Sequence, residues 1–443
     1  MTLVKNQNFK DLFSTLINQL WRLISGPITM LLIPLFLSPS QQGYWYLFSS
    51  LSALSIFADL GFSNIVMQFS AHEFAFLTLS EQRVCLGDDY HLKKLGSFFR
   101  FVIKWISSLC IIAFPIIYLI GIIFFYRDTV LSVYLLPWTI YTIGSLINFF
   151  NNSILSFIEG LNQIASVQKI RFHVAVINTF FIAILLILRV NIYALACAGF
   201  FSSAYIFISI FGTFKKLLKQ LLEVSKGFSY SWRREISPLF VKYAISSVTV
   251  YIALYIYTPL MHLFHGPIYS GKVGLSFTLI SAIYGVANIW IYTVTPRMNI
   301  LVETKDWKTL DKLLHKRLIF SVITYTLIIL SMISFFVIAD KTKIPILMKI
   351  TSRCFPLIYI LPLAIAYFLN VFINAWGVYL AAHKQLPYLI PNILSTFMMF
   401  GLTLFIAMYC KPELFFVGTC ITYIVFFFVS LIIFKKCRKS WHE

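Results

Sequence analysis

The sequence has few charged residues and little of the chemistry that catalysis or metal binding requires. Charged residues make up 12% of its 443 positions, against roughly 25% in an average soluble domain. Its seven cysteines are odd in number, scattered and never spaced as C-x-x-C, so neither a disulfide framework nor a metal site is indicated. It has no G-x-x-x-x-G-K-[ST] phosphate loop, so nucleotide hydrolysis is not supported. We therefore expect no metal and no cofactor.

Apolar and basic residues dominate instead. The chain is 59% hydrophobic and 18% aromatic, a composition that indicates a polytopic membrane protein rather than a soluble one. Its formal net charge is +20, with 36 Lys and Arg residues against 16 Asp and Glu residues. These cations lie in short loops between apolar runs, where orientation in a membrane explains them better than nucleic-acid binding does. Nucleic acid is therefore not an expected partner.

Twelve apolar runs are long enough to cross a hydrocarbon core of roughly 30 Å as helices. The sequence therefore predicts an all-α, polytopic membrane protein with twelve transmembrane helices. The first run is too long for the core of a signal peptide, so we expect it to be retained. The runs cover residues 12–37, 44–70, 97–126, 130–157, 172–188, 192–212, 243–264, 272–297, 318–340, 354–382, 389–410 and 414–434.

The distribution of Lys and Arg predicts the orientation of these helices. Of the 36 cations, 27 fall in the segments on the side that contains both termini and 8 fall on the opposite side, with Arg22 left inside the first run. Loops rich in Lys and Arg stay in the cytoplasm. Both termini are therefore expected to be cytoplasmic.

Two pairs of similar segments suggest that the chain contains an internal repeat, so that its two halves are related. The segment LSPSQQGYWYLFSSLSAL (37–54) resembles IYSGKVGLSFTLISAI (268–283), and FIEGLNQIASVQKI (157–170) resembles YLAAHKQLPYLIPN (379–392). The first match places Gly43 on Gly274, and the second places Gln163 on Gln385. The offsets are nearly equal, which predicts two six-helix bundles, residues 1–225 and 226–443, joined by the basic loop 213–242. Bundles related in this way usually enclose a substrate path and rock about it.

Two charges lie unusually deep in the apolar runs. Arg22 is about 15 Å from the cytoplasmic end of the first helix, and Asp59 is about 16 Å from that of the second, so the two share a depth. Three interpretations of Arg22 remain open. It reaches the headgroups with its long side chain, it pairs with Asp59, or it faces an aqueous cavity and binds an anionic phosphate. We favour the cavity, with Asp59 as the resting partner of Arg22 or a proton-accepting site.

Other polar side chains in the helices are further candidates. Asparagine amides suit sugar hydroxyls, although they also commonly form hydrogen bonds between helices. Asn148 and Asn152 in the fourth helix, Asn288 in the eighth and Asn374 in the tenth, near Asn370, are candidate substrate-binding residues. Glu159, at the end of the fourth helix, and Arg297, at the end of the eighth, are candidate gate or coupling residues.

One stretch resembles a known family. The segment SPSQQGYWYLFSSLSALSIFADLGFSNIVMQFSA (38–71) and the turn EGLNQ (159–163) are similar to those of the O-antigen flippases. These are the Wzx-type transporters of lipid-linked oligosaccharides in the multidrug/oligosaccharidyl-lipid/polysaccharide (MOP) exporter superfamily. The resemblance implies a MOP/MATE-like fold, a pair of six-helix lobes around a cationic cavity. Arg22 and Asp59 match positions that related flippases use on their first two helices.

The resemblance also implies a function and partners. The expected activity is the transfer of undecaprenyl-pyrophosphate-linked O-antigen repeat units from the cytoplasmic to the periplasmic leaflet of the bacterial inner membrane, by alternating access and without enzymatic chemistry. The expected partners are this lipid-linked oligosaccharide, membrane lipids, and as candidates the O-antigen polymerase and the chain-length regulator. Such a protein contributes to lipopolysaccharide biosynthesis.

Two alternatives belong to other classes. A multidrug exporter of the same superfamily should have an acidic and apolar site for cations, which Arg22 would repel. An O-antigen polymerase is a membrane enzyme of comparable size, and it should carry a large outward loop for which the sequence leaves no room.

Overall fold

The computed structural model describes the backbone of residues 2–442 and most of their side chains. The side chains outside the described part are those of residues 2–13, 16, 22, 23, 239, 241, 242, 245, 246 and 442. The first ten elements are α1 (Thr2–Phe36), α2 (Pro39–Ser52), α3 (Ser55–Asp59), α4 (Phe62–Phe74), β1 (Leu77–Leu79), β2 (Cys85–Gly87), α5 (Asp89–Arg127), α6 (Leu131–Gly160), α7 (Ile164–Ile187) and α8 (Tyr193–Val224). The others are α9 (Trp232–Leu254), α10 (Tyr257–Tyr292), α11 (Thr295–Glu303), α12 (Trp307–Thr342), α13 (Pro345–Thr351), α14 (Leu357–Ala382), α15 (Leu389–Tyr409), the 3-10 turn η1 (Pro412–Leu414) and α16 (Phe415–His442).

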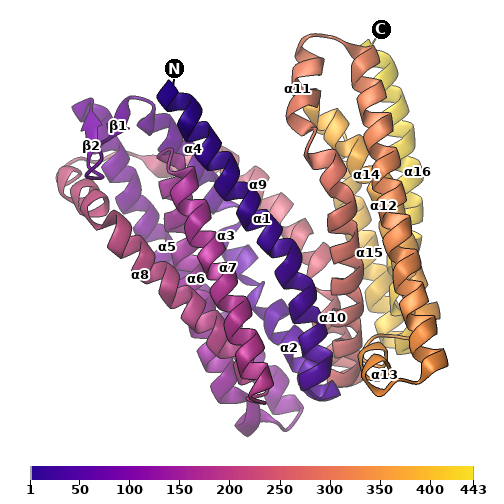
Figure 1. The fold of residues 1–443 in the computed structure, drawn as a ribbon. Coiled ribbons are helices and arrows are strands. Elements are labelled where there is room, and N and C mark those ends of the chain that lie inside the picture. The colour runs from indigo at the N-terminus through magenta and orange to yellow at the C-terminus, as the bar shows by residue number, and fades with distance from the viewer. Residues whose placement is uncertain (1, 443) are drawn as a thin grey trace. The chain divides into compact units, whose positions relative to one another are not determined.

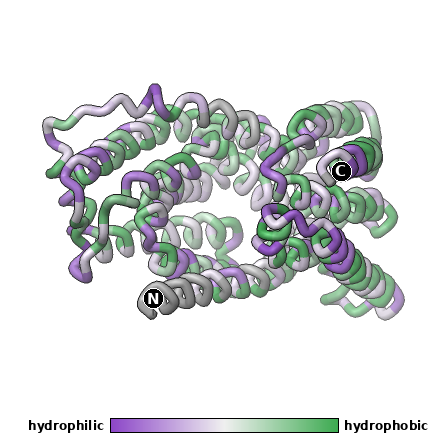
Figure 2. The backbone as a smooth tube through the Cα atoms, turned by 90° about the horizontal axis from the view of Figure 1, so that it is seen from above, coloured by the Kyte–Doolittle hydropathy of each residue, from purple (hydrophilic) through white to green (hydrophobic). Residues whose placement is uncertain are grey.

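The helices account for the predicted membrane spans. Among the described residues, ten helical stretches are long and apolar enough to cross a membrane, and α2–α3 with α4 form one further span bent by 45°. The stretch Ser247–Glu303 is 57 residues long, and it breaks at Gly266, whose backbone is not helical (φ 78°, ψ −175°). Because about 20 residues suffice for one crossing, this stretch is long enough for two. Hydrophobic residues run along much of the helices (Figure 2), and the prediction of an all-α polytopic membrane protein is confirmed.

The chain packs as two compact units, which are described one at a time. The first contains residues 1–32 and 48–251, and the second contains residues 33–47 and 252–443. Each unit thus takes in a segment from beyond the boundary drawn at residues 225 and 226, since 226–251 pack with the first unit and 33–47 with the second. The division into functional lobes 1–225 and 226–443 stays a prediction.

Long helices form the body of the first unit. α6 packs against α4, α5 and α8, and α7 packs against α8. Their buried faces form an aromatic core that includes Phe98, Phe99 and Phe157, each at most 1% exposed. At the start of α5, Asp88 accepts a hydrogen bond from the backbone N–H of His91 at 3.0 Å. This cap satisfies one of the N–H groups that the first turn of a helix leaves free.

A short hairpin connects α4 and α5. β1 and β2 are antiparallel, with Leu77 paired to Gly87 and Leu79 to Cys85. Gln220 near the end of α8 anchors the hairpin, because its side-chain amide accepts from the Cys85 N–H and donates to the Cys85 carbonyl, both at 2.8 Å. Figure 1 shows the hairpin at the end of the unit where α8 terminates.

In the second unit, α2 and α10 cross at glycines. A Cβ on Gly43 would lie 1.9 Å from the carbonyl oxygen of Pro267, and one on Gly271 would lie 2.9 Å from the Gly43 nitrogen. A Cβ on Gly274 would lie 2.3 Å from Cγ of Tyr46. The two segments whose similarity suggested a repeat thus lie against each other, and small residues let their backbones approach closely, as is common between membrane helices.

The C-terminal end of α1 is held in the second unit by distant cations. Lys349 of α13 donates to the Leu35 carbonyl at 2.6 Å, and Arg353 donates to the Leu37 carbonyl at 2.7 Å. The last carbonyls of a helix have no partner within the helix, and basic side chains are favoured there. These bonds explain why residues 33–47 pack with residues far along the chain.

Candidate functional site

Asp59 lies at a break in the predicted second membrane helix. α3 ends at Asp59, and the next two residues have positive φ angles, 45° at Leu60 and 77° at Gly61, before α4 begins. The Asp59 carboxylate accepts hydrogen bonds from the Ser63 backbone N–H at 3.2 Å and from its hydroxyl at 2.7 Å. An acidic group at the start of a helix satisfies a free N–H group and interacts favourably with the helix dipole. Asp59 therefore caps α4 within the membrane helix.

Arg22 lies in α1, and its side chain is outside the described part of the structure. The predicted pairing of Arg22 with Asp59 and the predicted cavity role both remain predictions. Among the side chains that the structure describes, Asp59 forms no ion pair.

Glu159 is part of a polar network at the turn between α6 and α7. Arg171 binds both oxygens of the Glu159 carboxylate, at 2.9 Å and 3.3 Å. Gln168 also donates to this carboxylate, at 3.3 Å, and accepts from Asn18 of α1 at 2.9 Å. Asn18 is only 2% exposed, so the network joins α1 to the start of α7. The guanidinium neutralises Glu159, whose gate role remains a prediction.

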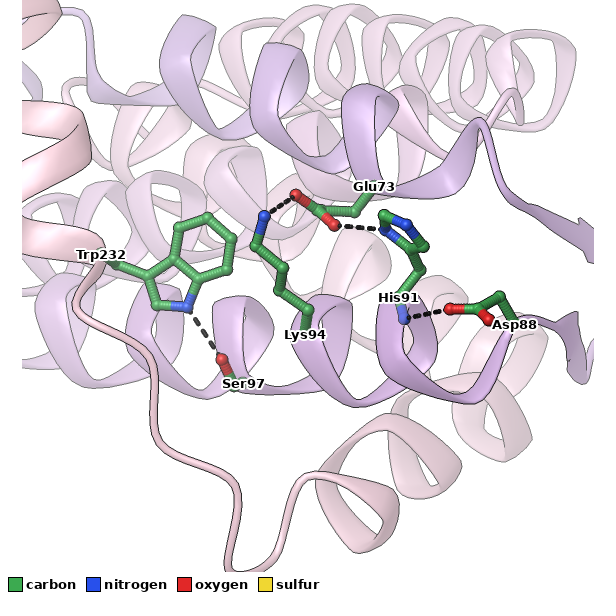
Figure 3. Close-up of polar contacts among 6 residues, drawn as sticks. All are labelled: Glu73, Asp88, His91, Lys94, Ser97 and Trp232. Carbon is green, nitrogen blue, oxygen red and sulfur yellow. Dashed lines mark hydrogen bonds and ion pairs between the residues drawn. The ribbon is translucent and has the colours of Figure 1, made fainter.

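A second cluster in the first unit brings Glu73 and Lys94 together (Figure 3). Glu73 is in the last turn of α4, and its carboxylate lies 2.6 Å from the Lys94 ammonium and 2.9 Å from Nδ1 of His91 on α5. Glu73 is 6% exposed. In the sequence, Lys94 stands out only as one of the orienting cations, because the β1–β2 hairpin separates it from Glu73. The signal that could have revealed the cluster is a carboxylate at the end of an apolar helix, which needs a partner when buried.

The same cluster holds the start of α9. The Trp232 indole donates to the Ser97 hydroxyl at 2.8 Å, as Figure 3 shows, and packs against Phe98 with ring centroids 4.6 Å apart. Lys94 lies 4.7 Å from the Tyr230 ring centroid and 5.5 Å from that of Trp232. These contacts explain why residues 226–251 pack with the first unit.

We expect Glu73→Gln to lower the free energy of unfolding by about 2 kcal/mol, since it leaves a largely buried ammonium without its counter-charge. The remaining contacts of Lys94 with two aromatic rings limit the loss. Thermal unfolding of the purified protein in detergent would measure it. Asp89→Asn removes an exposed i, i+4 pair with Lys93 and should change stability by no more than about 0.5 kcal/mol. Equal effects of the two variants would contradict the burial argument.

In the second unit, two of the predicted substrate-binding residues meet. Asn374 of α14 donates to the side-chain oxygen of Asn288 of α10 at 2.7 Å. Asn288 donates to the Tyr284 carbonyl at 2.9 Å, and Tyr292 donates to the side-chain oxygen of Asn374 at 3.2 Å. Asn288 is fully buried and Asn374 half-buried. The hydrogen bonds fix the orientation of both amides.

Asn374 also lines a pocket within this unit. The pocket has a volume of about 320 Å³ and lies between α14, α15, α16 and the end of α9. Asn370 and Tyr423, which also line it, have side chains that form no hydrogen bond with the described part of the chain. Its lining residues are Ala253, Asn370, Ile373, Asn374, Gly377, Val378, Ala381, Tyr388, Asn392, Ser395, Thr396, Met399, Thr422, Tyr423 and Phe426.

The remaining candidates are not among the residues that line this pocket. Asn148 is exposed and Asn152 half-buried on α6 in the first unit. Arg297 is exposed on α11 in the second unit. Their predicted roles in binding and gating remain predictions.

Comparison with known proteins rests on structure alone, because no family model and no curated protein matches the sequence. An inward-facing multidrug resistance MATE family transporter of the MOP superfamily superposes with a TM-score of 0.58 at 15% identity, over 98% of each chain. A MATE protein in complex with MaD3S gives 0.55 at 14% identity, over 99% of this chain and 96% of that one.

A third similar structure is a MOP superfamily transporter from Pyrococcus furiosus, with a TM-score of 0.55 at 12% identity over 99% of this chain and 97% of that one. Its binding pocket is described as having reversed polarity, suggesting a different function. The matches extend over essentially the whole chain and agree with the expected MOP/MATE-like architecture. The chain therefore has the fold of the MOP superfamily transporters.

Proposed function

We propose that the protein is a flippase for undecaprenyl-pyrophosphate-linked oligosaccharides, the O-antigen repeat units, which it moves from the cytoplasmic to the periplasmic leaflet of a bacterial inner membrane. The transporter fold and the resemblance of residues 38–71 to O-antigen flippases support this proposal. The fold alone suits several substrates, so the choice between them depends on the charges inside the helices.

The observation that carries the proposal is that two carboxylates in or next to the apolar runs, Asp59 and Glu159, accept hydrogen bonds from residues of the chain itself. Asp59 lies well inside an apolar run, and its side chain caps α4. Glu159, at the end of the fourth run, is bound by the Arg171 guanidinium. A cation exporter needs a carboxylate that is free to bind its substrate. Arg171 occupies both oxygens of Glu159, and Oδ1 of Asp59 already accepts two hydrogen bonds from Ser63. An anionic substrate has no such requirement.

The cationic character of the chain suits a pyrophosphate. Moving this group unaided through hydrocarbon is prohibitive, because an unpaired charge at the membrane centre is costly. A guanidinium offers a fork of donors that matches phosphate geometry, and in this proposal Arg22 supplies it. The polyprenyl tail stays in the bilayer while the headgroup crosses.

Reconstitution would test the proposal directly. Purified protein is placed in liposomes with a trace of a polyprenyl-pyrophosphate-linked oligosaccharide that carries a fluorophore on its sugar, and external dithionite is added. With active protein, nearly all the fluorescence should be quenched, whereas protein-free liposomes should keep about the half that lies in the inner leaflet. Quenching that stays at half with the protein present would refute the proposal.

A multidrug exporter is the second candidate, because the similar structures include transporters described as multidrug resistance proteins. Cells with and without the protein should accumulate a fluorescent cation equally if the flippase proposal holds. Export of the cation without movement of the lipid would favour the second candidate. The polymerase is less suitable, since the described connections α5–α6 and α7–α8 span only residues 128–130 and 188–192.

A further inference from the structure

We propose that the pocket between α14, α15 and α16 binds a neutral pyranose ring of the transported oligosaccharide. This inference deepens the proposed function and rests on it for the identity of the lipid that carries the sugar. All the residues that line the pocket belong to the second unit, whereas Arg22 belongs to the first. The sugar and the pyrophosphate would therefore be bound by different residues.

The lining of the pocket is polar but uncharged. None of the fifteen lining residues, all in the described part of the chain, is Asp, Glu, Lys or Arg, while eight carry an amide, a hydroxyl or a phenol group. A charged ligand would lose its hydration without gaining a counter-charge, which is costly. An apolar chain would leave the amides without partners, which is also costly. The chemistry fits a neutral ligand with many hydroxyl groups.

The polar groups divide into those that are fixed and those that are free. Asn374 is bonded to Asn288 and Tyr292, and the Tyr388 hydroxyl donates to the Ser430 carbonyl at 2.7 Å. In contrast, the side chains of Asn370, Asn392 and Tyr423 form no hydrogen bond with any described residue. The bonded groups hold the walls in place, and a rigid site loses less entropy when a ligand binds.

The free groups match the hydrogen-bonding pattern of a sugar. Each asparagine amide has two donor hydrogens and an acceptor oxygen, and a phenol can donate or accept. A hydroxyl group also donates and accepts, so neighbouring hydroxyls on a ring can bond to both ends of one amide. Asn370 on α14, Tyr423 on α16 and Asn392 on α15 approach the pocket from three helices.

The size of the pocket and its aromatic residues also fit a sugar ring. A volume of about 320 Å³ is at the lower end of the roughly 300–1,000 Å³ range for small-molecule sites, so the pocket suits a short segment rather than a whole oligosaccharide. Tyr388, Tyr423 and Phe426 line it. Aromatic rings provide flat apolar surfaces next to polar groups, which suit the C–H faces of a pyranose.

The test measures binding of simple sugars to the full-length protein. The probes are the methyl glycosides of glucose, galactose, mannose and N-acetylglucosamine, observed by saturation-transfer NMR in a detergent without a sugar headgroup. At least one should bind to the wild type. Asn370→Leu and Tyr423→Phe should each weaken its binding roughly 3- to 10-fold, as expected for one lost hydrogen bond. Asn299→Leu, on the exposed face of α11, is the matched control and should bind like the wild type.

The outcomes separate this inference from the proposed function. If no probe binds the wild type, or if both pocket variants bind like the control while all remain folded, the pocket is not a sugar site. If liposomes show lipid movement in that case, the flippase proposal stands and only the inference fails. If the glycosides bind through Asn370 but no pyrophosphate-linked lipid moves, the proposed function fails and the sugar site remains.

Discussion

Replacing Gly43 with alanine is expected to lower the free energy of unfolding by about 3 kcal/mol, the upper end of the usual range for overpacking a core. The added methyl group would lie 1.9 Å from the Pro267 carbonyl oxygen, and within 2.9 Å of two more backbone atoms of the same residue. A backbone carbonyl cannot rotate away as a side chain can. α2 and α10 would have to separate, and the close approach at Gly271 would be lost as well.

Thermal unfolding in detergent and the yield in the membrane would both report this change. Gly401→Ala is the matched control, because Gly401 is exposed on α15 and a Cβ there meets no atom within 4 Å. That variant should be neutral or more stable by up to about 1 kcal/mol, since alanine favours a helix over glycine. If Gly43→Ala unfolds at the same temperature as Gly401→Ala, the two helices do not meet as described.

Arg22→Ala is expected to abolish transport of the lipid-linked oligosaccharide while leaving membrane insertion normal. Under the proposed function, the guanidinium is the group that replaces the water around the pyrophosphate, and its loss restores the cost of moving an unpaired anion through hydrocarbon. Arg22→Lys should keep part of the activity, because an ammonium retains the charge but not the planar fork of donors. The dithionite assay in liposomes would measure the rates of all three proteins.

Arg127→Ala provides the control, since Arg127 is exposed at the end of α5 and its loss changes the net charge equally. That variant should transport like the wild type. Unimpaired transport by Arg22→Ala would rule out the cavity interpretation and leave either a headgroup contact or a structural pair with Asp59.

The character of the membrane helices could be read from local stretches of sequence. A run of apolar residues long enough to cross the bilayer forms a helix wherever it occurs, because its backbone groups have no other partners in hydrocarbon. The helix breaks were harder to place. Gly266 divides what would otherwise be one long helix, and Leu60 and Gly61 adopt left-handed conformations within the predicted second span.

The candidate site was only partly visible in the sequence. Asn288 and Asn374 were identified one at a time as membrane asparagines, and nothing local indicated that they bond to each other. Asp59 stood out as a deep charge, but its bonds to Ser63 depend on the break before α4. The pairing of Glu73 with Lys94 was missed, because each is unremarkable until α4 and α5 lie side by side.

The sequence by itself determined that this chain is a helical membrane protein with a series of long apolar runs and a strong excess of cations, since length and hydrophobicity act locally along the chain. The tertiary structure alone decided which side chains meet. It packed Gly43 against Pro267 and placed Lys349 and Arg353 where they donate hydrogen bonds to carbonyls at the end of α1. It also placed three asparagine side chains around one pocket. These contacts depend on how each helix is rotated and packed, and that outcome reflects the combined energy of many distant residues rather than any single segment.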